Sequence, residues 1–183
     1  MKKFIKVFCL LLTLCLTLSI FGCNLGVSEK VPTEDKFFVY EETSQGYIIS
    51  SLAEEFKEEL PSQIILPSTY NGKNVIKIGT SLFAGTAITS ISIPSTITEI
   101  GLYAFESCTS LKAIEFSEGL QYIRQGAFSK CSGLANTIIF PKTLKAIETR
   151  AFEYCNLLSV VDVVSTCTIA TDAFGAEVTI NKI

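Results

Sequence analysis

The chain contains no histidine and no tryptophan among its 183 residues. Histidine is the commonest general base and the commonest neutral metal ligand, so its absence excludes many hydrolase mechanisms and makes a metal site unexpected. Because no other nucleophile and base form a recognisable set, the sequence predicts neither an enzyme nor a cofactor site. Tryptophan is a frequent anchor of protein interfaces, so a binding surface here would rely on other side chains.

Lysine and arginine are few once the start of the chain is set aside. Three lysines precede an apolar run from Val7 to Phe21, which at 15 residues is shorter than the about 20 residues of a bilayer span. Such an N-terminus is typical of an export signal. Removing residues 1–22 takes away these three of the 15 basic residues and none of the 18 acidic ones, which leaves a net charge of −6. No basic patch remains, so we expect no nucleic-acid partner.

The junction after the apolar run, Ile20-Phe21-Gly22-Cys23, resembles a bacterial lipobox. In that motif a small residue precedes a cysteine that receives lipid and becomes the new N-terminus. Gly22 and Cys23 fit the pattern, whereas Phe21 departs from the Ala or Ser usual at its position. We therefore expect a lipoprotein signal peptide at 1–22 and a lipid anchor on Cys23, holding the chain to a membrane of the bacterial envelope. An ordinary signal or an uncleaved anchor is the alternative, and each of these exports the chain.

One sequence motif recurs five times in the rest of the chain. It consists of an isoleucine followed five residues later by a phenylalanine. The isoleucines are Ile78, Ile100, Ile123, Ile147 and Ile169, and the phenylalanines are Phe83, Phe105, Phe128, Phe152 and Phe174. Both series therefore advance along the chain by the same four nearly equal steps, of which the third is the longest. A period of this length indicates units that stack and share one continuous core, with the phenylalanines inside it.

Each repeat also carries an apolar pattern that matches leucine-rich repeats. It reads Leu111-x-x-Ile114-x-Phe116 in one repeat and recurs at 88–93 and 158–163. Alternation within it predicts a parallel strand whose apolar residues point inward and whose intervening residues, such as Ser92, point outward. The repeat at 134–140 has one extra residue before Ile138, which we expect in a loop. The Ala-Phe pairs are expected to form one helical or 3-10 turn per repeat.

The segment before the repeats divides into a tether and a cap. Residues 23–36 are short and polar, which is typical of a tether. Two β-rich runs around Gly46 predict a hairpin, and the acidic segment from Leu52 to Leu60 predicts a short helix or loop. We assign 37–61 to a cap over the first coil and 62–183 to the solenoid itself.

Three cysteines, Cys108, Cys131 and Cys155, each lie three residues after a repeat phenylalanine and should form a ladder inside the stack. Buried free thiols are the expected state, because free cysteine behaves as a small hydrophobic residue. A disulfide or a metal site is the alternative, although parallel side chains suit a disulfide poorly and three thiols make no tetrahedral set. Cys167 lies outside this ladder and is expected to be a half-exposed thiol.

The segment at 93–111, Ile-Pro-Ser-Thr-Ile-Thr-Glu-Ile-Gly-Leu-Tyr-Ala-Phe-Glu-Ser-Cys-Thr-Ser-Leu, resembles the BspA-type leucine-rich repeat family of bacterial surface proteins. The resemblance covers about residues 37–183. It implies a curved solenoid displayed at the cell surface, in a family whose members act as adhesins or protein-binding modules. It implies no catalytic residues. Members often carry many more repeats, so about five repeats would offer a small binding face.

The candidate binding face is the outward side of the predicted strands, where small and polar residues dominate. It comprises Ser90, Ser92, Ala113, Glu115, Thr137, Ile139, Val160 and Asp162. We expect it to bind a host or bacterial surface protein whose identity the sequence does not give. A structural envelope lipoprotein without an external ligand is the alternative. Tyr103, Tyr122 and Tyr154 lie on the opposite side, where we interpret them as covers over neighbouring coils.

Overall fold

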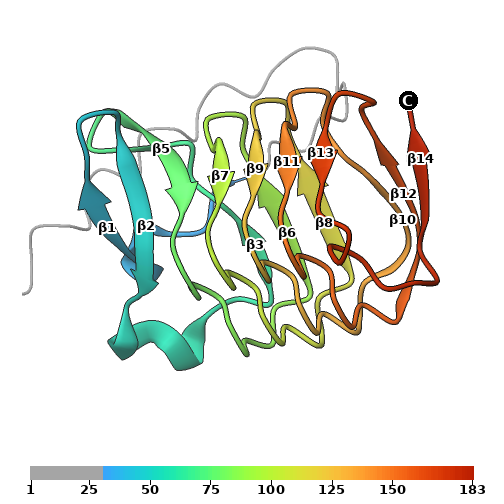
Figure 1. The fold of residues 1–183 in the computed structure, drawn as a ribbon. Coiled ribbons are helices and arrows are strands. Elements are labelled where there is room, and N and C mark those ends of the chain that lie inside the picture. The colour runs from blue at the N-terminus through green and yellow to red at the C-terminus, as the bar shows by residue number, and fades with distance from the viewer. Residues whose placement is uncertain (1–30) are drawn as a thin grey trace, which may run out of the picture.

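The computed structural model describes residues 31–183, so the predicted signal peptide, Cys23 and the first part of the tether lie outside the described residues. Figure 1 shows strands following one another as successive rungs, from a hairpin at the N-terminal end to β14 at the other. The strands are β1 Phe38–Glu42, β2 Tyr47–Leu52, β3 Gln63–Ile65, β4 Thr69–Tyr70, β5 Lys73–Ile78, β6 Ser90–Ile93, β7 Glu99–Ile100, β8 Ala113–Phe116, β9 Tyr122–Ile123, β10 Ala135–Ile139, β11 Ala146–Ile147, β12 Leu157–Val163, β13 Thr168–Ile169 and β14 Thr179–Lys182. Two 3-10 helices, η1 Asp35–Phe37 and η2 Glu54–Glu59, complete the elements. The predicted leucine-rich repeat solenoid is confirmed.

The repeats build two walls of strands rather than the single one that the sequence pattern predicts. In the first wall the strand order is β1-β2-β5-β7-β9-β11-β13, with β4 attached to β5. The second wall consists of two separate sheets, β3-β6-β8 and β10-β12-β14. The repeat isoleucines lie in the first wall, where Ile78, Ile100, Ile123, Ile147 and Ile169 pair rung to rung. The isoleucine of each repeat therefore fixes a short parallel ladder.

The repeat phenylalanines form one stack through the solenoid. Successive ring centroids, from Phe83 through Phe105, Phe128 and Phe152 to Phe174, lie 5.2, 4.8, 4.9 and 5.1 Å apart. The first four rings are fully buried. Phe174 is only half-buried, because it occupies the last position of the stack. These spacings match the separation of paired strands, so ring stacking and strand pairing reinforce one another.

The Ala-Phe segments are turns, and they do not extend into helices. In one repeat Ala104 N–H donates to Gly101 O at 3.3 Å and Glu106 N–H donates to Tyr103 O at 3.0 Å. These i→i+3 bonds are of the 3-10 type that the sequence predicts. Tyr103, however, has a φ of 53°. A left-handed residue interrupts helical geometry, so the chain turns a corner at this point.

The N-terminal cap has the predicted hairpin and acidic segment. β1 and β2 pair antiparallel, β2 then pairs parallel with β5, and η2 follows directly. The ring of Phe38 lies 6.3 Å from that of Phe83, so the hairpin covers the first ring of the stack. Thr33 N–H also donates to Ile65 O at 2.8 Å, which ties the last part of the expected tether to β3. No helix within residues 31–183 is long and apolar enough to cross a membrane.

The ladder cysteines are buried and carry free thiols. Each thiol donates a hydrogen bond to the backbone carbonyl of the phenylalanine on the preceding rung. These bonds join Cys108 to Phe83 at 3.0 Å, Cys131 to Phe105 at 3.0 Å and Cys155 to Phe128 at 3.2 Å. Thr86 occupies the matching position in the first repeat, and its hydroxyl donates at 2.8 Å to Phe83 O within its own turn. The carbonyls of Phe83, Phe105 and Phe128 also accept the backbone N–H three residues further on, so each cysteine thiol adds a further hydrogen bond to a carbonyl that is already paired.

The expected exposure of Cys167 is wrong, because its side chain is only 4% exposed. Its N–H donates to Val164 O, as Leu144 N–H does to Pro141 O one rung earlier. Cys167 thus occupies the inward position of Leu144, and the outward position passes to Thr168. The last repeat is one residue shorter between this position and its isoleucine, which shifts the cysteine into the core.

Candidate functional site

The eight residues predicted as a binding face all lie on the second wall and are accessible from outside. Those on the two central strands, β8 and β10, are exposed, and those on the flanking strands, β6 and β12, are half-buried. The exposed residues are Ala113, Glu115, Thr137 and Ile139, and the half-buried ones are Ser90, Ser92, Val160 and Asp162. Ile139 is the most apolar side chain among them and is 67% exposed. The centre of the predicted face is thus its most accessible part.

The second wall is split at this centre. Within the described residues, β8 pairs only with β6, and β10 pairs only with β12. The residue by which this repeat exceeds its neighbours falls between Leu134 and Ile138, in the first part of β10. The register with β12 is also irregular there, because β12 advances from Leu158 to Val160 while β10 advances only from Asn136 to Thr137. Our expectation of a loop insertion is therefore wrong. An extra residue within a strand disrupts its ladder locally, as a β-bulge does.

The split is confined to the second wall. On the first wall β9 and β11, which belong to the same two rungs, pair normally through Ile123 and Ile147. The rings of Phe128 and Phe152 are also stacked, 4.9 Å apart. The two rungs are thus held at the ordinary spacing on one side and separated on the other.

The separated strands are tied together again at both ends. Before them, a side chain on Gly133 would place its Cβ 2.6 Å from Thr109 O and 2.8 Å from Leu111 O, so the two backbones touch there. After them, the carboxylate of Glu118 accepts the backbone N–H groups of Lys142 and Thr143 at 3.1 and 3.2 Å. The opening between β8 and β10 is therefore bounded by backbone contacts on either side.

The opening forms a groove of about 490 Å³. It is lined by Lys112, Ala113, Ile114, Glu115, Phe116, Leu134, Ala135, Thr137, Ile138 and Ile139. Ile114 and Phe116 are only half-buried, whereas Ile91 and Ile93 at the same register of β6 are 2% and 0% exposed. The groove therefore gives solvent access to side chains that the rest of the wall buries. The ring centroids of Phe116 and Phe140, on the two neighbouring rungs, lie 5.4 Å apart.

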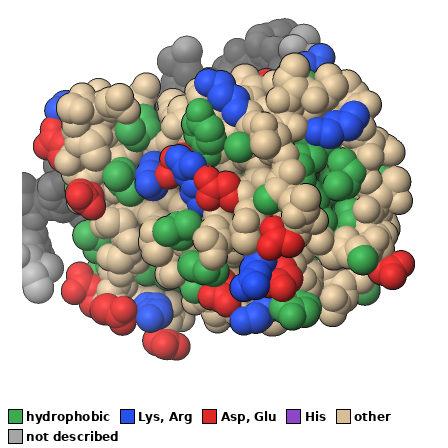
Figure 2. Space-filling model, viewed as in Figure 1, with side chains coloured by type: hydrophobic (Ala, Val, Ile, Leu, Met, Phe, Trp, Pro, Cys, Tyr) green, Lys and Arg blue, Asp and Glu red, His purple; other side chains and the backbone are tan. Residues whose placement is uncertain are grey.

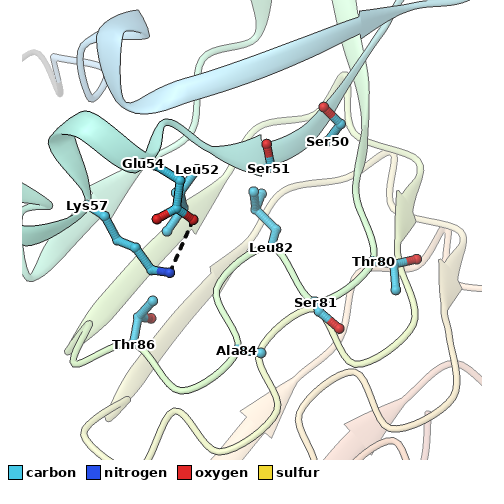
Figure 3. A pocket seen from close by; sticks show the side chains of 10 residues that line it. All are labelled: Ser50, Ser51, Leu52, Glu54, Lys57, Thr80, Ser81, Leu82, Ala84 and Thr86. Atoms are coloured by element: carbon cyan, nitrogen blue, oxygen red, sulfur yellow. Dashed lines mark hydrogen bonds and ion pairs between the residues drawn. The ribbon is translucent and has the colours of Figure 1, made fainter.

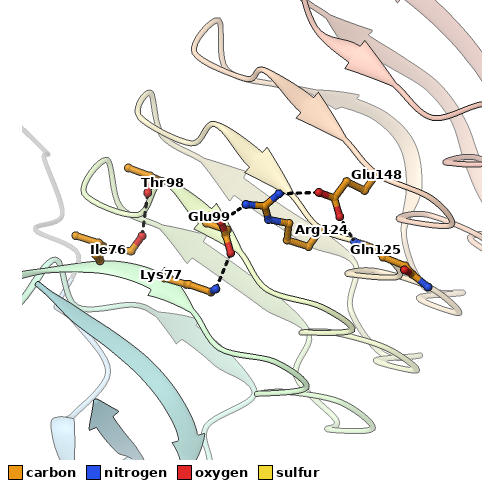
Figure 4. A network of polar contacts seen from close by, with 7 residues as sticks. All are labelled: Ile76, Lys77, Thr98, Glu99, Arg124, Gln125 and Glu148. Atoms are coloured by element: carbon orange, nitrogen blue, oxygen red, sulfur yellow. Dashed lines mark hydrogen bonds and ion pairs between the residues drawn. The ribbon is translucent and has the colours of Figure 1, made fainter. Parts of the chain in front are cut away.

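Charged side chains collect on the first wall, in a chain across four rungs (Figure 4). Lys77 Nζ lies 2.6 Å from Glu99 Oε1, and Arg124 bridges Glu99 Oε2 at 2.5 Å and Glu148 Oε1 at 2.7 Å. Burial acts to raise the pKa of Glu99, but hydrogen bonds from Arg124 and Lys77 outweigh it and lower the pKa below 4.5. The hydrogen bonds to Glu99 and Glu148 raise the pKa of Arg124. Charges on this wall are thus paired with each other.

The view onto the first wall shows acidic and basic side chains intermingled, with no large field of one sign (Figure 2). Two of the three tyrosines that the sequence assigned to this side cover their neighbours. Tyr103 OH accepts a hydrogen bond from Gln125 Nε2 of the next rung at 2.8 Å, and Lys145 Nζ of the next rung lies 6.0 Å from the centroid of the Tyr122 ring. Tyr154 is 57% exposed. The first wall therefore has the character of a solvated, internally paired surface.

A smaller pocket lies between the cap and the first turn (Figure 3). Hydroxyl groups of β2 and of residues 80–86 line it, and the ion pair between Lys57 and Glu54, 3.4 Å long, stands at its side. Its volume of about 150 Å³ is below the about 300 Å³ at which ligand pockets begin. No group of three or more potential metal ligands occurs within residues 31–183. The groove on the second wall is thus the better candidate site.

The sequence predicted which side chains point outward from the second wall, but it did not predict the groove between β8 and β10. The extra residue before Ile138 was the available signal, since the step from Ile123 to Ile147 is the longest of the series and must be absorbed somewhere. The half-buried floor residues Ile114 and Phe116 were not recognised, because their sequence pattern is that of ordinary core positions. The charge chain on the first wall was also missed, since its members are about one repeat apart in the sequence.

The family model of the BspA-type leucine-rich repeat region matches residues 54–183 of this chain, in six copies. This match covers well over half of the chain, so the protein belongs to the BspA-type leucine-rich repeat family. No relative was found among curated proteins.

Solved structures of bacterial leucine-rich repeat proteins have the same fold. A leucine-rich repeat protein of T. pallidum is 34% identical with a TM-score of 0.70, over 78% of this chain and 66% of that one. One from Bacteroides ovatus is 29% identical with a TM-score of 0.67, over 85% of this chain and 41% of the other. A leucine-rich cell surface protein of Faecalibacterium prausnitzii, 24% identical with a TM-score of 0.59 over 79% of this chain and 46% of that one, supports the fold alone. This chain thus spans about two thirds of the treponemal protein and less than half of the Bacteroides ovatus protein.

Proposed function

We propose that this chain is an exported bacterial lipoprotein, anchored through Cys23, whose solenoid binds another protein through the outer face of the second wall. The observation that carries the binding proposal is the groove between β8 and β10, where the predicted face is most exposed and apolar side chains reach solvent. Repeat solenoids build extended binding surfaces from such faces. Exposed apolar patches on otherwise polar surfaces mark interaction sites.

Export and anchoring are supported by the N-terminal sequence. Three lysines, a short apolar run and the Gly22-Cys23 junction follow one another in the order of a lipoprotein signal.

The anchor is tested by the intact mass of the protein extracted from membranes of a bacterium that processes lipoproteins. We expect a mass for residues 23–183 plus lipid, and loss of the lipid mass in Cys23→Ala. Cys15→Ala is the matched control, because it alters a cysteine inside the segment that cleavage removes, and it should be lipidated normally. Cleavage without added lipid would make the chain a secreted solenoid and would end the anchor proposal.

Binding is tested by affinity capture of surface proteins on the purified protein, compared with Ala113→Arg and Thr80→Arg variants. Ala113 lies in the centre of the face, whereas Thr80 is exposed in a turn away from it. We expect partners that are retained by Thr80→Arg and lost by Ala113→Arg. If nothing is enriched over an acidic control protein, the chain is better described as a structural envelope lipoprotein.

A further inference from the structure

We propose that the last rung of the solenoid, residues 164–183, is a docking surface for the same rung of a second copy of this chain, and that Lys182 keeps this surface from associating. The inference goes beyond the proposed function, because it concerns the end of the stack and not the outer face of the second wall. Three features of the last rung carry it: exposed core positions, unpaired strand edges and the inward direction of Lys182.

The last rung leaves apolar core positions open to solvent. Phe174 continues the phenylalanine stack but is half-buried, whereas Phe152 on the preceding rung is 0% exposed. Ile180 of β14 pairs with Val161 of β12 and is 41% exposed, whereas Val161 is 0% exposed. The inner positions are buried because the next coil covers them. Another rung stacked on this end would bury Phe174 and Ile180 in the same way.

Both strands of this rung also have an edge without a partner strand. Within residues 31–183, β13 pairs only with β11, and β14 pairs only with β12. Figure 1 shows β14 as the outermost strand at this end of the stack. An unpaired edge presents backbone N–H and C=O groups with which a strand of another chain can pair. The last rung therefore offers hydrogen bonds as well as apolar surface.

Lys182 occupies a core position of the second wall. It pairs with Val163 in the register of β12 and β14, so its side chain points to the same side as that buried valine. Among the described rungs, only the last one carries a charge at this position. On the earlier rungs the position is apolar and is held by Leu66, Ile93, Phe116, Phe140 and Val163.

The ammonium group of Lys182 makes further stacking on this end unfavourable. Its Nζ donates a hydrogen bond to the backbone carbonyl of Cys167 at 2.8 Å, so the lysine stem lies over the rung beside this buried cysteine. A second rung placed on this end would remove the ammonium from water. Burying a charge without an acidic partner is costly, and inward-pointing charges are a known protection of strand edges. Lys182 therefore keeps the end of the stack in solvent.

Charge distribution favours a tail-to-tail contact between two copies. The N-terminal end of the stack is covered by the hairpin cap, and residues 31–61 carry eight acidic and two basic side chains. The last rung carries only Asp172 and Glu177 beside its one lysine. A head-to-tail contact would thus bring a strongly acidic cap against an acidic rung, whereas two last rungs bring fewer like charges together. A two-fold axis would then pair the β14 strands antiparallel in a closed dimer.

The test is sedimentation velocity of the full-length protein over a series of concentrations. The protein is held in lipid nanodiscs at one copy per disc, because free detergent would cover an apolar surface. Lys182→Val gives the last rung the residue of the preceding one and should double the sedimenting mass as concentration rises. Lys142→Val is the matched control, because it removes one lysine from an exposed turn in the middle of the solenoid.

Two further variants separate the inward charge from other effects. Lys182→Glu keeps a charge at the position but cannot donate to Cys167 O, and it should stay monomeric. Ile180→Lys, added to Lys182→Val, returns a positive charge to the other inward position of β14 and should restore the monomer. Misfolding of Lys182→Val would not be reversed by this second substitution. Circular dichroism and thermal unfolding establish that each variant is folded.

We expect a dimer for Lys182→Val alone, and monomers for the unaltered chain and for the other variants. A monomeric Lys182→Val or a dimeric unaltered chain would overturn the inference, and so would dimers of Lys182→Glu or of the double variant. Oligomers longer than a dimer would overturn the two-fold arrangement, since a tail-to-tail contact closes on itself. Capture of a surface protein through Ala113 does not depend on any of these results, so the proposed function is tested separately.

Discussion

The thiol of Cys131 donates a hydrogen bond to the backbone carbonyl of Phe105, 3.0 Å away on the preceding rung. The side chain thus joins two turns whose phenylalanine rings also stack, 4.8 Å apart. The same relationship recurs for Cys108 and Cys155. The sequence places a cysteine here because a small residue with one donor fits where the turns approach closely.

The thiols of Cys131 and Cys155 should be chemically inert in the folded protein. Burial raises the pKa of Cys155 to about 12, and hydrogen bonding with Cys108 together with burial raises that of Cys131. The thiolate is the nucleophile, so at pH 8 iodoacetamide should label neither Cys131 nor Cys155 until the protein unfolds. Mass spectrometry after timed labelling measures this. An exposed Thr137→Cys variant should react at once, and rapid labelling of Cys131 in the native protein would contradict its burial.

The phenylalanine stack should dominate the stability of the solenoid. Phe128→Ala removes a fully buried ring with stacked neighbours on both sides, and we expect it to cost about 3–5 kcal/mol. Phe174→Ala is the matched control, because Phe174 is half-buried and has one stacked neighbour in the series, so it should cost clearly less. Urea denaturation measures both. A loss below about 1 kcal/mol for Phe128→Ala would mean that the ring is not part of the core.

The order of the stack was predictable from the sequence because it depends on spacing alone. An isoleucine and a phenylalanine five residues apart, repeated at nearly constant intervals, fix one inward position on the first wall and one in the core. The first wall itself was not predicted, because two-residue strands such as β7 and β9 are too short to show alternation. Cys167 was misplaced for a related reason, since one missing residue moves it from an outward to an inward position.

The candidate site was predictable as a face but not as a groove. Alternation along β6 and β8 was enough to place Ser92 and Glu115 outward. Whether an extra residue bulges into a loop or splits a sheet depends on the backbone contacts of neighbouring rungs, such as those of Gly133 and Glu118. A single repeat does not contain that information. The groove is therefore a property of the stack rather than of any one repeat.

The charge chain on the first wall should make stability depend on acid pH. The pKa of Glu99 is lowered in the folded protein, so the unfolded state takes up protons first as pH falls, and stability present above pH 4.5 is lost below it. Glu99→Gln should reduce stability at pH 7 by about 1 kcal/mol, because the site is partly solvated, and should flatten the acid dependence. Glu54→Gln is the control, since the side chain of Glu54 is 84% exposed and its loss should change little. Denaturation at pH 7 and pH 3.5 measures both, and an unchanged acid slope in Glu99→Gln would contradict the assignment.

A side chain at Gly126 should destabilise the fold because it would meet the ring of Tyr103. Its φ is +62°, and an added Cβ would lie 2.4 Å from two carbon atoms of the tyrosine ring on the preceding rung. Gly85 has a similar φ of +70° with nothing within 4 Å, so Gly85→Ala measures the backbone strain alone, about 1 kcal/mol. We expect Gly126→Ala to cost about 1–2 kcal/mol more than that. Removing the ring with Tyr103→Ala should abolish the difference, and equal costs in both glycine variants would mean that the ring moves aside freely.

The split of the second wall should be visible in hydrogen exchange without any ligand. β6 is paired on both edges, with β3 and β8, whereas β8 is paired only with β6 among the described residues. Among the described residues no strand pairs with β8 on its groove side, so the amides of Ile114 and Phe116 should exchange faster than those of segment 89–93 in the same protein. Deleting Asn136 should slow exchange across 112–117 and 134–139 while leaving 89–93 unchanged, because β8 and β10 then pair. Mass spectrometry of peptic fragments measures all three segments. Equal protection of 112–117 and 89–93 in the unaltered chain would mean that β8 and β10 are paired in solution and that the groove is closed.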